Sequence, residues 1–295
     1  MSLPLDGTYD LQGHRGARGK RPENTIPAFQ FCLENHMTTI ELDTNLTKDH
    51  QLIVYHDTVL NCKLCRHENG KPATPVPIKD LTVTELKQLD CGVSPNEDFP
   101  EQIPVKGTRL ITLAEFFDFV RKSEKDQVRL NPVRFNIETK FRHDYTPSDV
   151  SVMAGLMVKT IADAAMTQRS TVQSFVLEVL PQVKRLNEHI QTSALFEPGP
   201  VRAFLLKSGF LWGREEIIQK ALSVDADIIS PHFLYIDRKF IQRCHSFGKK
   251  VLPWVVNQEK MMEDFFEWGV DGIISDYPDR LYRVYSRWSE DRNRK

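Results

Sequence analysis

Short extended runs of apolar and β-branched residues alternate along most of the chain with longer runs whose apolar positions recur at helical spacing. Strands are expected at 9–14, 38–43, 51–56, 133–139, 171–175, 190–196, 227–229, 250–255 and 270–274. Helices are expected at 24–35, 112–120, 146–165, in a run ending at 187, and at 237–247, 259–268 and 278–288, with 200–222 helical in pieces broken around Gly209 and Gly213. Strands that alternate with helices of this length predict parallel strands joined by crossover helices.

Residues 61–107 depart from this alternation, because they contain six prolines and few long periodic runs. One short helix is expected after Thr82, since Thr82 and Glu85 have the spacing of a capping box. We interpret this stretch as an insertion subdomain within a single domain that spans residues 1–295.

About eight strand–helix units are expected, and the chain without 61–107 has 248 residues. A (β/α)₈ barrel has roughly 250 residues. The expected fold class is therefore α/β, a TIM barrel with a small insertion subdomain after the second strand region. A doubly wound open sheet is the main alternative, although no G-x-G-x-x-G follows a predicted strand, which disfavours a dinucleotide-binding version.

Charge and hydropathy narrow the function classes. The chain has 39 basic and 40 acidic residues, so it lacks the basic excess typical of nucleic-acid binding. Its apolar fraction of 40% is ordinary for a globular protein. The N-terminal residues show no secretory signal, and there is no apolar run of about 18 residues that would span a membrane. We expect a cytoplasmic protein with a small-molecule partner.

Five cysteines lie at positions 32, 62, 65, 91 and 244. In a chain without a secretory signal, they are expected to be thiols rather than a disulfide framework. Cys62-x-x-Cys65, with His67 and Cys91 nearby, is a weak zinc signal because a second Cys-x-x-Cys is missing.

Candidate chemistry begins at the end of the first predicted strand, where His14 and Arg15 lie between Gly13 and Gly16. Histidine exchanges a proton near neutral pH, and arginine offers a fixed fork of donors to phosphate oxygens. The flanking glycines allow a close approach of the backbone to a ligand. A phosphate site is one interpretation, and a turn with a surface basic pair is the other.

Glu41 and Asp43 end the second predicted strand, and residues i and i+2 of a strand point to one face. Two carboxylates held close together repel unless a proton or a cation lies between them, and hard oxygen donors suit Mg²⁺ or Ca²⁺. A solvated edge strand would explain the two acids equally well.

Two further groups have the same position relative to predicted strands. His56-Asp57 follows 51–56, and Glu138 and Lys140 share a face at the end of 133–139. A structural histidine and a surface ion pair would explain each group alone. Their occurrence together at predicted strand ends favours one site at the mouth of a barrel.

These motifs resemble those of the glycerophosphodiester phosphodiesterase family over almost the whole chain. The matching segments are Gly13-His14-Arg15-Gly16, Pro22-Glu23-Asn24-Thr25, Glu41-Leu42-Asp43, Val54-Tyr55-His56-Asp57, Asn136-Ile137-Glu138-Thr139-Lys140, Gln173-Ser174-Phe175, the strand ending at Trp254 with Val256-Asn257, and Asp271-Gly272-Ile273-Ile274-Ser275-Asp276-Tyr277-Pro278. The resemblance implies a TIM barrel that hydrolyses glycerophosphodiesters to glycerol 3-phosphate and an alcohol, with its insertion where 61–107 lies.

The resemblance also implies a role for each matching residue. His14 and His56 would be the general acid and base. One divalent cation, Mg²⁺ or Ca²⁺, would be held by three carboxylates: Glu41, Asp43 and Glu138. The phosphate would be bound by Arg15 and Lys140, and the same site would be supported by Glu23, Asn24, Gln173 and Trp254.

Alternatives remain at this point. The same machinery could act on lysophospholipids or as a phosphoinositide-type phosphodiesterase, or the barrel could bind a phosphate ligand without turnover. Five aromatic residues are candidates for an apolar rim that would decide between a small headgroup and a lipid tail: Phe31, Trp212, Phe233, Trp254 and Tyr277. A homo-oligomer is also compatible with the sequence.

Overall fold

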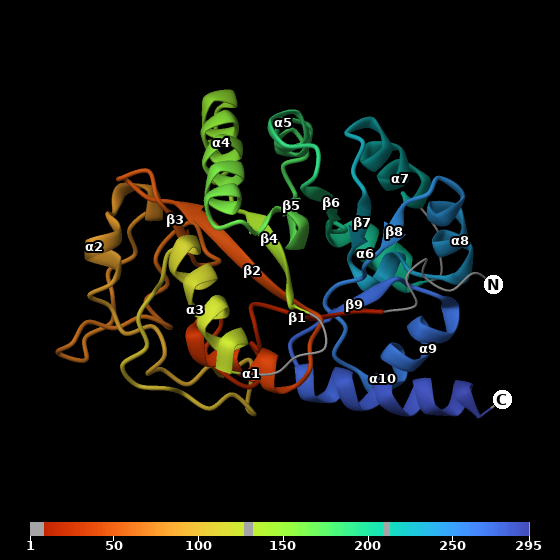
Figure 1. Cartoon of the computed structure of the whole chain (residues 1–295), viewed down its shortest axis with the longest axis horizontal. Coiled ribbons are helices and arrows are strands. Elements are labelled where there is room, and N and C mark those ends of the chain that lie inside the picture. Colours follow the sequence, from red (N-terminus) through yellow and green to blue (C-terminus); the bar gives the residue numbers. More distant parts are fainter. Residues whose placement is uncertain (1–8, 127–131, 209–212, 295) are drawn as a thin grey trace.

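The computed structural model describes residues 9–126, 132–208 and 213–294, which form a barrel of parallel strands surrounded by helices (Figure 1). The parallel strands are β1 (Asp10–Gly13), β2 (Thr39–Leu46), β4 (Arg134–Thr139), β5 (Ser170–Ser174), β6 (Gln191–Phe196), β7 (Ile228–Pro231), β8 (Lys250–Val251) and β9 (Gly272–Ser275). Their order in the sheet is β8-β7-β6-β5-β4-β2-β1-β9. Hydrogen bonds of 2.9 Å from Val256 N to Ile274 O and 3.1 Å from Ile274 N to Pro253 O close the ring.

The predicted (β/α)₈ barrel is thus confirmed, and the doubly wound open sheet is excluded. The nine expected strands all exist, but the one expected at 51–56 has a different role. It is β3 (Leu52–Val54), which pairs antiparallel with the extended end of β2. Because this hairpin turns the chain back, Tyr55 N donates to Asp43 O at 3.0 Å, and the residues that follow lie at the barrel mouth.

Helices cover the outside of the barrel, and their starts follow the sequence signals. The helices are α1 (Ile26–Glu34), α2 (Val83–Leu86), α3 (Leu113–Asp126), α4 (Pro147–Asp163), α5 (Val179–Leu186), α6 (Pro200–Lys207), α7 (Arg214–Ser223), α8 (Arg238–Ser246), α9 (Glu259–Trp268) and α10 (Pro278–Asn293), with short 3₁₀ turns η1 (Ile78–Asp80), η2 (Thr167–Arg169) and η3 (Phe233–Tyr235). Thr82 and Glu85 form the predicted capping box of α2. None of the helices in the described ranges has the length and hydropathy needed to cross a membrane.

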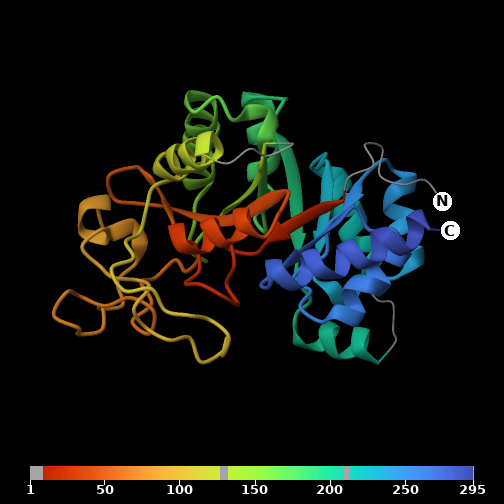
Figure 2. The same cartoon turned by 60° about the horizontal axis from the view of Figure 1, so that its bottom comes forward.

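The insertion lies to one side of the barrel, away from α7 to α10, in both views (Figures 1 and 2). It has a small hydrophobic cluster that is separate from the main core between strands and helices. Tyr55, Ile78, Leu86 and Leu110 belong to this cluster and are buried. The insertion therefore has its own packing, although it begins and ends on the barrel.

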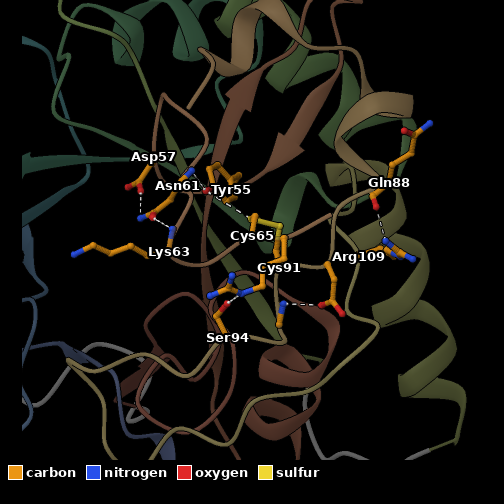
Figure 3. Close-up of a disulfide and its surroundings, with 12 residues drawn as sticks. Tyr55, Asp57, Asn61, Lys63, Cys65, Gln88, Cys91, Ser94 and Arg109 are labelled. Atoms are coloured by element: carbon orange, nitrogen blue, oxygen red, sulfur yellow. Dashed lines mark hydrogen bonds between the residues drawn. A yellow bond between two sulfur atoms is a disulfide. The ribbon is translucent and has the colours of Figure 1, made fainter. Parts of the chain in front are cut away.

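The prediction for the cysteines is wrong in part. Cys65 and Cys91 form a disulfide inside the insertion, 26 residues apart in sequence (Figure 3). Cys32, Cys62 and Cys244 take no part in a disulfide. The sulfurs of Cys65 and Cys91 are bonded to each other and so cannot bind zinc. The weak zinc signal around Cys62 and His67 therefore does not correspond to a metal site.

Candidate active site

Three carboxylates lie together at the carboxyl ends of β2 and β4. Glu41 and Asp43 project from β2, and Glu138 projects from β4 beside Asp43 in the strand register. One oxygen from each lies within 4.8 Å of the others, and all three side chains are buried. The prediction that Glu41 and Asp43 share a face is confirmed, and the alternative of a solvated edge strand is excluded.

The pKa values of Glu41 and Asp43 are shifted in opposite directions. Burial, together with the nearby charges of Asp43 and Glu138, raises the pKa of Glu41 well above its usual range. Burial alone would also raise the pKa of Asp43, but Lys140 and Arg15 hold it well below its usual range. Ionising all three buried acids at once is unfavourable because their negative charges repel. The cluster therefore favours a bound positive charge.

Lys140 and Arg15 supply the positive charge nearest to these acids. Lys140 Nζ lies 2.5 Å from Glu138 Oε1 and 3.1 Å from Asp43 Oδ1, as the shared face at the end of β4 predicted. Arg15 Nε lies 3.3 Å from Asp43 Oδ2, and Arg15 N donates to Glu41 Oε2 at 2.7 Å. The alternative of a surface basic pair is excluded, because the Arg15 side chain is only 8% exposed.

The turn after β1 depends on its glycines. Gly16 has a φ of +79°, and Arg15 itself has a φ of +51°, both in the left-handed region. A Cβ at Gly13 would lie 2.1 Å from Gly16 O and 2.4 Å from Cys32 Sγ. Larger residues at Gly13 would therefore push Arg15 away from the acids.

Three of the four expected supporting residues contact the cluster or its neighbour Arg15. Glu23 Oε1 accepts from Arg15 at 2.6 Å. Asn24 Nδ2 donates to Asp43 Oδ2 at 2.7 Å, and Gln173 Nε2 donates to Glu41 Oε1 at 2.8 Å. These amide and ionic contacts leave the acids fixed in orientation.

His14 follows β1 and is held by a carboxylate from the far end of the chain. His14 Nδ1 lies 2.6 Å from Asp276 Oδ1, and Asn257 Nδ2 donates to Asp276 Oδ2 at 2.7 Å. Burial alone would raise the pKa of Asp276, but His14 lowers it, so the carboxylate is ionised and accepts a proton donated by Nδ1. Nε2 of His14 is then the free acceptor, and burial lowers the pKa of this imidazole despite Asp276.

His56 has a similar arrangement on the insertion side of the mouth. His56 Nδ1 lies 2.6 Å from Asp57 Oδ1, and Asn61 Nδ2 donates to Asp57 Oδ2 at 2.9 Å. Burial would raise the pKa of Asp57, but the hydrogen bond with His56 lowers it. Asn61 is in turn fixed because its backbone N donates to the Tyr55 hydroxyl at 2.9 Å.

An inner cavity of about 290 Å³ brings the two histidines to one space. Its polar lining consists of His14, Arg15, Arg18, Glu41, His56, Glu138, Lys140, Gln173 and Glu197, and its apolar lining of Phe175, Leu195, Trp254, Val255 and Ile274. Two imidazoles, a cluster of acids and three cations around one cavity can bind a phosphate ester and move protons on it.

The expected apolar rim is only partly present. Trp254 lines the inner cavity and stacks edge-on against Phe175, with ring centroids 5.5 Å apart. Phe31 lies under Arg21, Tyr277 under Arg280, and Phe233 beside His232, outside the lining of this cavity. Trp212 lies outside the described residues.

Sequence reasoning missed several residues of the site. Asp276, Asn257 and Asn136 lie within the matching segments but received no role, and Asn61 was not considered. Asn136 Nδ2 donates to Gln12 at 2.8 Å and to Gln173 at 3.0 Å. A polar residue directly after the last predicted strand was the available signal for Asp276, since barrel sites gather such residues.

The acidic cluster fits a divalent cation. It offers three hard oxygen donors within reach of one ion. Lys140, whose Nζ lies between Asp43 and Glu138, shows that the cluster attracts positive charge.

Fold and site together define the class: a TIM barrel whose mouth combines two histidines with three buried carboxylates that could hold a metal ion. The model of the glycerophosphoryl diester phosphodiesterase family matches residues 14–280. The chain belongs to this family of phosphodiester hydrolases.

Individual relatives agree with the family. A glycerophosphodiester phosphodiesterase of Caldanaerobacter subterraneus is 31% identical over 274 residues, which cover 92% of this chain and 95% of the relative. A lysophospholipase D of Rattus norvegicus is 26% identical, with 94% and 86% covered. A solved structure from Silicibacter pomeroyi, provisionally assigned as a glycerophosphoryl diester phosphodiesterase, superposes with a TM-score of 0.84 at 25% identity and covers 96% of this chain and 94% of its own.

Proposed function

We propose that this protein hydrolyses glycerophosphodiesters to glycerol 3-phosphate and an alcohol. The observation that carries the proposal is that His14 and His56 line one cavity together with Glu41, Glu138 and Lys140. A barrel that only binds a phosphate ligand has no need of two histidines, each oriented by a carboxylate, beside a metal-binding cluster.

The cluster of Glu41, Asp43 and Glu138 would hold one divalent cation, Mg²⁺ or Ca²⁺. When bound, the cation neutralises the negative charge that develops on the phosphoryl oxygens. Arg15 and Lys140 add fixed positive charge to the same oxygens. The number and kind of oxygen donors suit both ions, so the choice between them is left to titration.

We assign the base role in the first step to His14. His14 lines the inner cavity, and its lowered pKa keeps Nε2 unprotonated. Nε2 takes the proton of the glycerol 2-hydroxyl as this oxygen attacks phosphorus, and protonated His56 gives its proton to the oxygen of the departing alcohol. The bond from phosphorus to that oxygen breaks, and a cyclic phosphate remains.

In the second step the two histidines exchange their roles as acid and base. Neutral His56 takes a proton from a water molecule that attacks phosphorus, and His14 returns its proton to the glycerol 2-oxygen as the ring opens. Both histidines return to their starting states, and the products are glycerol 3-phosphate and the free alcohol.

The test is the release of glycerol 3-phosphate from glycerophosphocholine with Mg²⁺, with Ca²⁺ and with a chelator. We expect release that depends on the cation and falls by about 10²- to 10⁴-fold in His14→Ala and His56→Ala, the range for loss of general acid–base catalysis. Absence of release under every condition, from protein that unfolds cooperatively on heating, would overturn the proposal.

His245→Gln is the matched control. His245 forms the same type of ion pair, with its Nε2 2.8 Å from Asp271 Oδ2, but it lies on α8 and outside the lining of the inner cavity. Activity within about twofold of the wild type would show that loss of a histidine–aspartate pair elsewhere in the barrel does not remove turnover.

A second candidate is hydrolysis of lysophospholipids by the same groups. Phe175 and Trp254 form an apolar edge of the inner cavity, and Phe175 is 42% exposed, so an acyl chain on the glycerol has apolar surface beside it. Lysophosphatidylcholine is the substrate to compare with glycerophosphocholine. If Phe175→Ala lowers kcat/KM for both substrates equally, this edge does not contact an acyl chain.

The cytoplasmic location and the homo-oligomer expected from the sequence stay predictions. The Cys65–Cys91 disulfide is the observation that opposes the cytoplasmic location, since such bonds persist mainly in oxidising compartments. Titration of thiols in unfolded protein should count three free thiols if the disulfide is present, and five if the chain is reduced.

A further inference from the structure

A second, outer cavity of about 550 Å³ adjoins the inner one on the side of the insertion. The two cavities share Arg15, Arg18 and His56 in their linings. A phosphate bound at these shared residues has the inner cavity on one side and the outer cavity on the other.

Two segments of the insertion form the outer wall, 61–66 and 94–98. The disulfide joins them, since Cys65 lies within the first and Cys91 lies just before the second. Arg66 Nε donates to Ser94 Oγ at 2.8 Å and adds a second link. In Figure 3, Asp57, Asn61 and Lys63 lie on the side of the disulfide that is opposite Gln88 and Arg109.

The place of each half of the substrate follows from the histidines, and this step rests on the proposed function. His14 lines only the inner of the two cavities, whereas His56 lines both. If His14 serves the glycerol hydroxyl and His56 serves the leaving alcohol, the glycerol lies in the inner cavity. The leaving alcohol then lies in the outer cavity, against the insertion.

The charges of the outer cavity fall into two groups. Glu23 is paired with Arg15 and Arg18, and Asp57 is paired with His56. The remaining four form no ion pair with each other or with any other described residue: Lys63, Arg66, Glu97 and Asp98. Two cations and two carboxylates of this cavity therefore lack an ionic partner, and of these Arg66 also donates hydrogen bonds to Ser94 and Gly70.

We propose that the outer cavity is the leaving-group subsite and that the insertion selects an alcohol carrying both an ammonium and a carboxylate, as serine does. Lys63 and Arg66 bind the carboxylate, and Glu97 and Asp98 bind the ammonium, through charge-assisted hydrogen bonds. A headgroup with one charge uses only half of these contacts.

The composition of the lining also argues against a quaternary ammonium headgroup. Such cations are recognised by the faces of aromatic rings. The described residues that line the outer cavity include no Phe, Tyr or Trp side chain. A choline headgroup is therefore expected to bind more weakly in this cavity than a serine headgroup, although the chemistry at phosphorus is the same.

The experiment compares kcat/KM for four substrates: glycerophosphoserine, glycerophosphoethanolamine, glycerophosphocholine and glycerophosphoglycerol. We expect the serine ester to exceed each of the others by about tenfold. Lys63→Ala should lower kcat/KM about tenfold for the serine ester and less than twofold for the ethanolamine ester. Glu97→Gln combined with Asp98→Asn should lower it for both and leave the glycerol ester unchanged.

Lys71→Ala is the matched control, because Lys71 is exposed in the same insertion but does not line the outer cavity. Thermal unfolding of each variant checks that the insertion remains folded. Equal kcat/KM for all four substrates, or variants that lower all four by the same factor, would overturn the inference while leaving the proposed function intact. Failure of all four substrates with the wild type would instead overturn the proposed function.

Discussion

The two histidine–aspartate pairs have the same local geometry but are built in different ways. In both, Nδ1 lies 2.6 Å from a carboxylate oxygen, and the other oxygen accepts from an asparagine. His14 and Asp276 are 262 residues apart in sequence, whereas His56 and Asp57 are neighbours. The carboxylate is 4% exposed in the first pair and 37% exposed in the second.

The His14–Asp276 pair therefore belongs to the barrel, whereas the His56–Asp57 pair lies where the insertion begins. Asp276 sits at the end of β9, where backbone pairing with β1 fixes it next to His14. Asp57 lies on a half-exposed turn beside the outer cavity, where water can replace a lost partner. Equal distances therefore do not imply equal energetic importance.

The largest effect is expected when Asp276 is removed. Asp276→Ala should lower kcat by about 10²- to 10⁴-fold, because His14 would lose the carboxylate that holds its Nδ1 tautomer and the vacated site is too buried for water to restore it. Asp57→Ala should lower kcat only about tenfold. Steady-state kinetics of both variants measures the difference, and equal losses would contradict the contrast between the pairs.

The pH profile tests whether Asp276 acts through His14. A base must be unprotonated, so activity falls as the pH drops through its pKa. Burial lowers the pKa of His14, so we expect the acidic limb of the kcat/KM profile below pH 6.5, the ordinary value for histidine.

Asp276 opposes this effect of burial, and its removal should move the limb further toward acid. Asp276→Asn should therefore show a lower apparent pKa as well as a lower rate, while Asp57→Asn should leave this limb in place. A purely structural role for Asp276 would reduce the rate without moving the limb.

A smaller effect is expected from opening the disulfide. Cys65→Ser combined with Cys91→Ser removes a cross-link that closes a loop of 26 residues, worth about 3 kcal/mol of unfolding free energy for the insertion. The wall of the outer cavity should loosen, so KM should rise about threefold to tenfold with little change in kcat. Cys62→Ser, which removes a free thiol from the same wall, is the control.

The smallest effect is expected at Asn61, and Asn257 is the matching asparagine of the other pair. Asn257→Ala should lower kcat about tenfold, since Asn257 also accepts from Asp276 N at 3.0 Å and from Ser275 Oγ at 3.1 Å. Asn61→Ala should lower it about twofold to threefold, because Asp57 is accessible to water. A reversed order in the measured kcat values would mean that the insertion side controls catalysis.

Much of the site could be predicted from local sequence because it uses short-range geometry. Glu41 with Asp43, and Glu138 with Lys140, are two residues apart on strands, and a strand places such pairs on one face. Asp276 could not be assigned in this way, because its partner His14 is at the other end of the chain. Their contact depends on β9 pairing with β1 as the ring closes.

The cysteines also show that local sequence does not predict contacts between distant residues. Composition and the absence of a secretory signal predicted five thiols, but Cys65 and Cys91 are brought together by the folding of the insertion around its own cluster. The role of 51–56 was likewise decided by pairing: its residues favour a strand in any context, and only the hairpin with β2 made β3 antiparallel.

The sequence by itself determined the alternation of strands and helices, their starts, and the chemical types placed at strand ends, because these depend on residues within a few positions of one another. Tertiary structure alone decided which of those groups share a cavity, which carboxylate orients which histidine, and that two loops of the insertion face the site. Those outcomes depend on contacts between distant segments, and a barrel creates them only when its first and last strands meet.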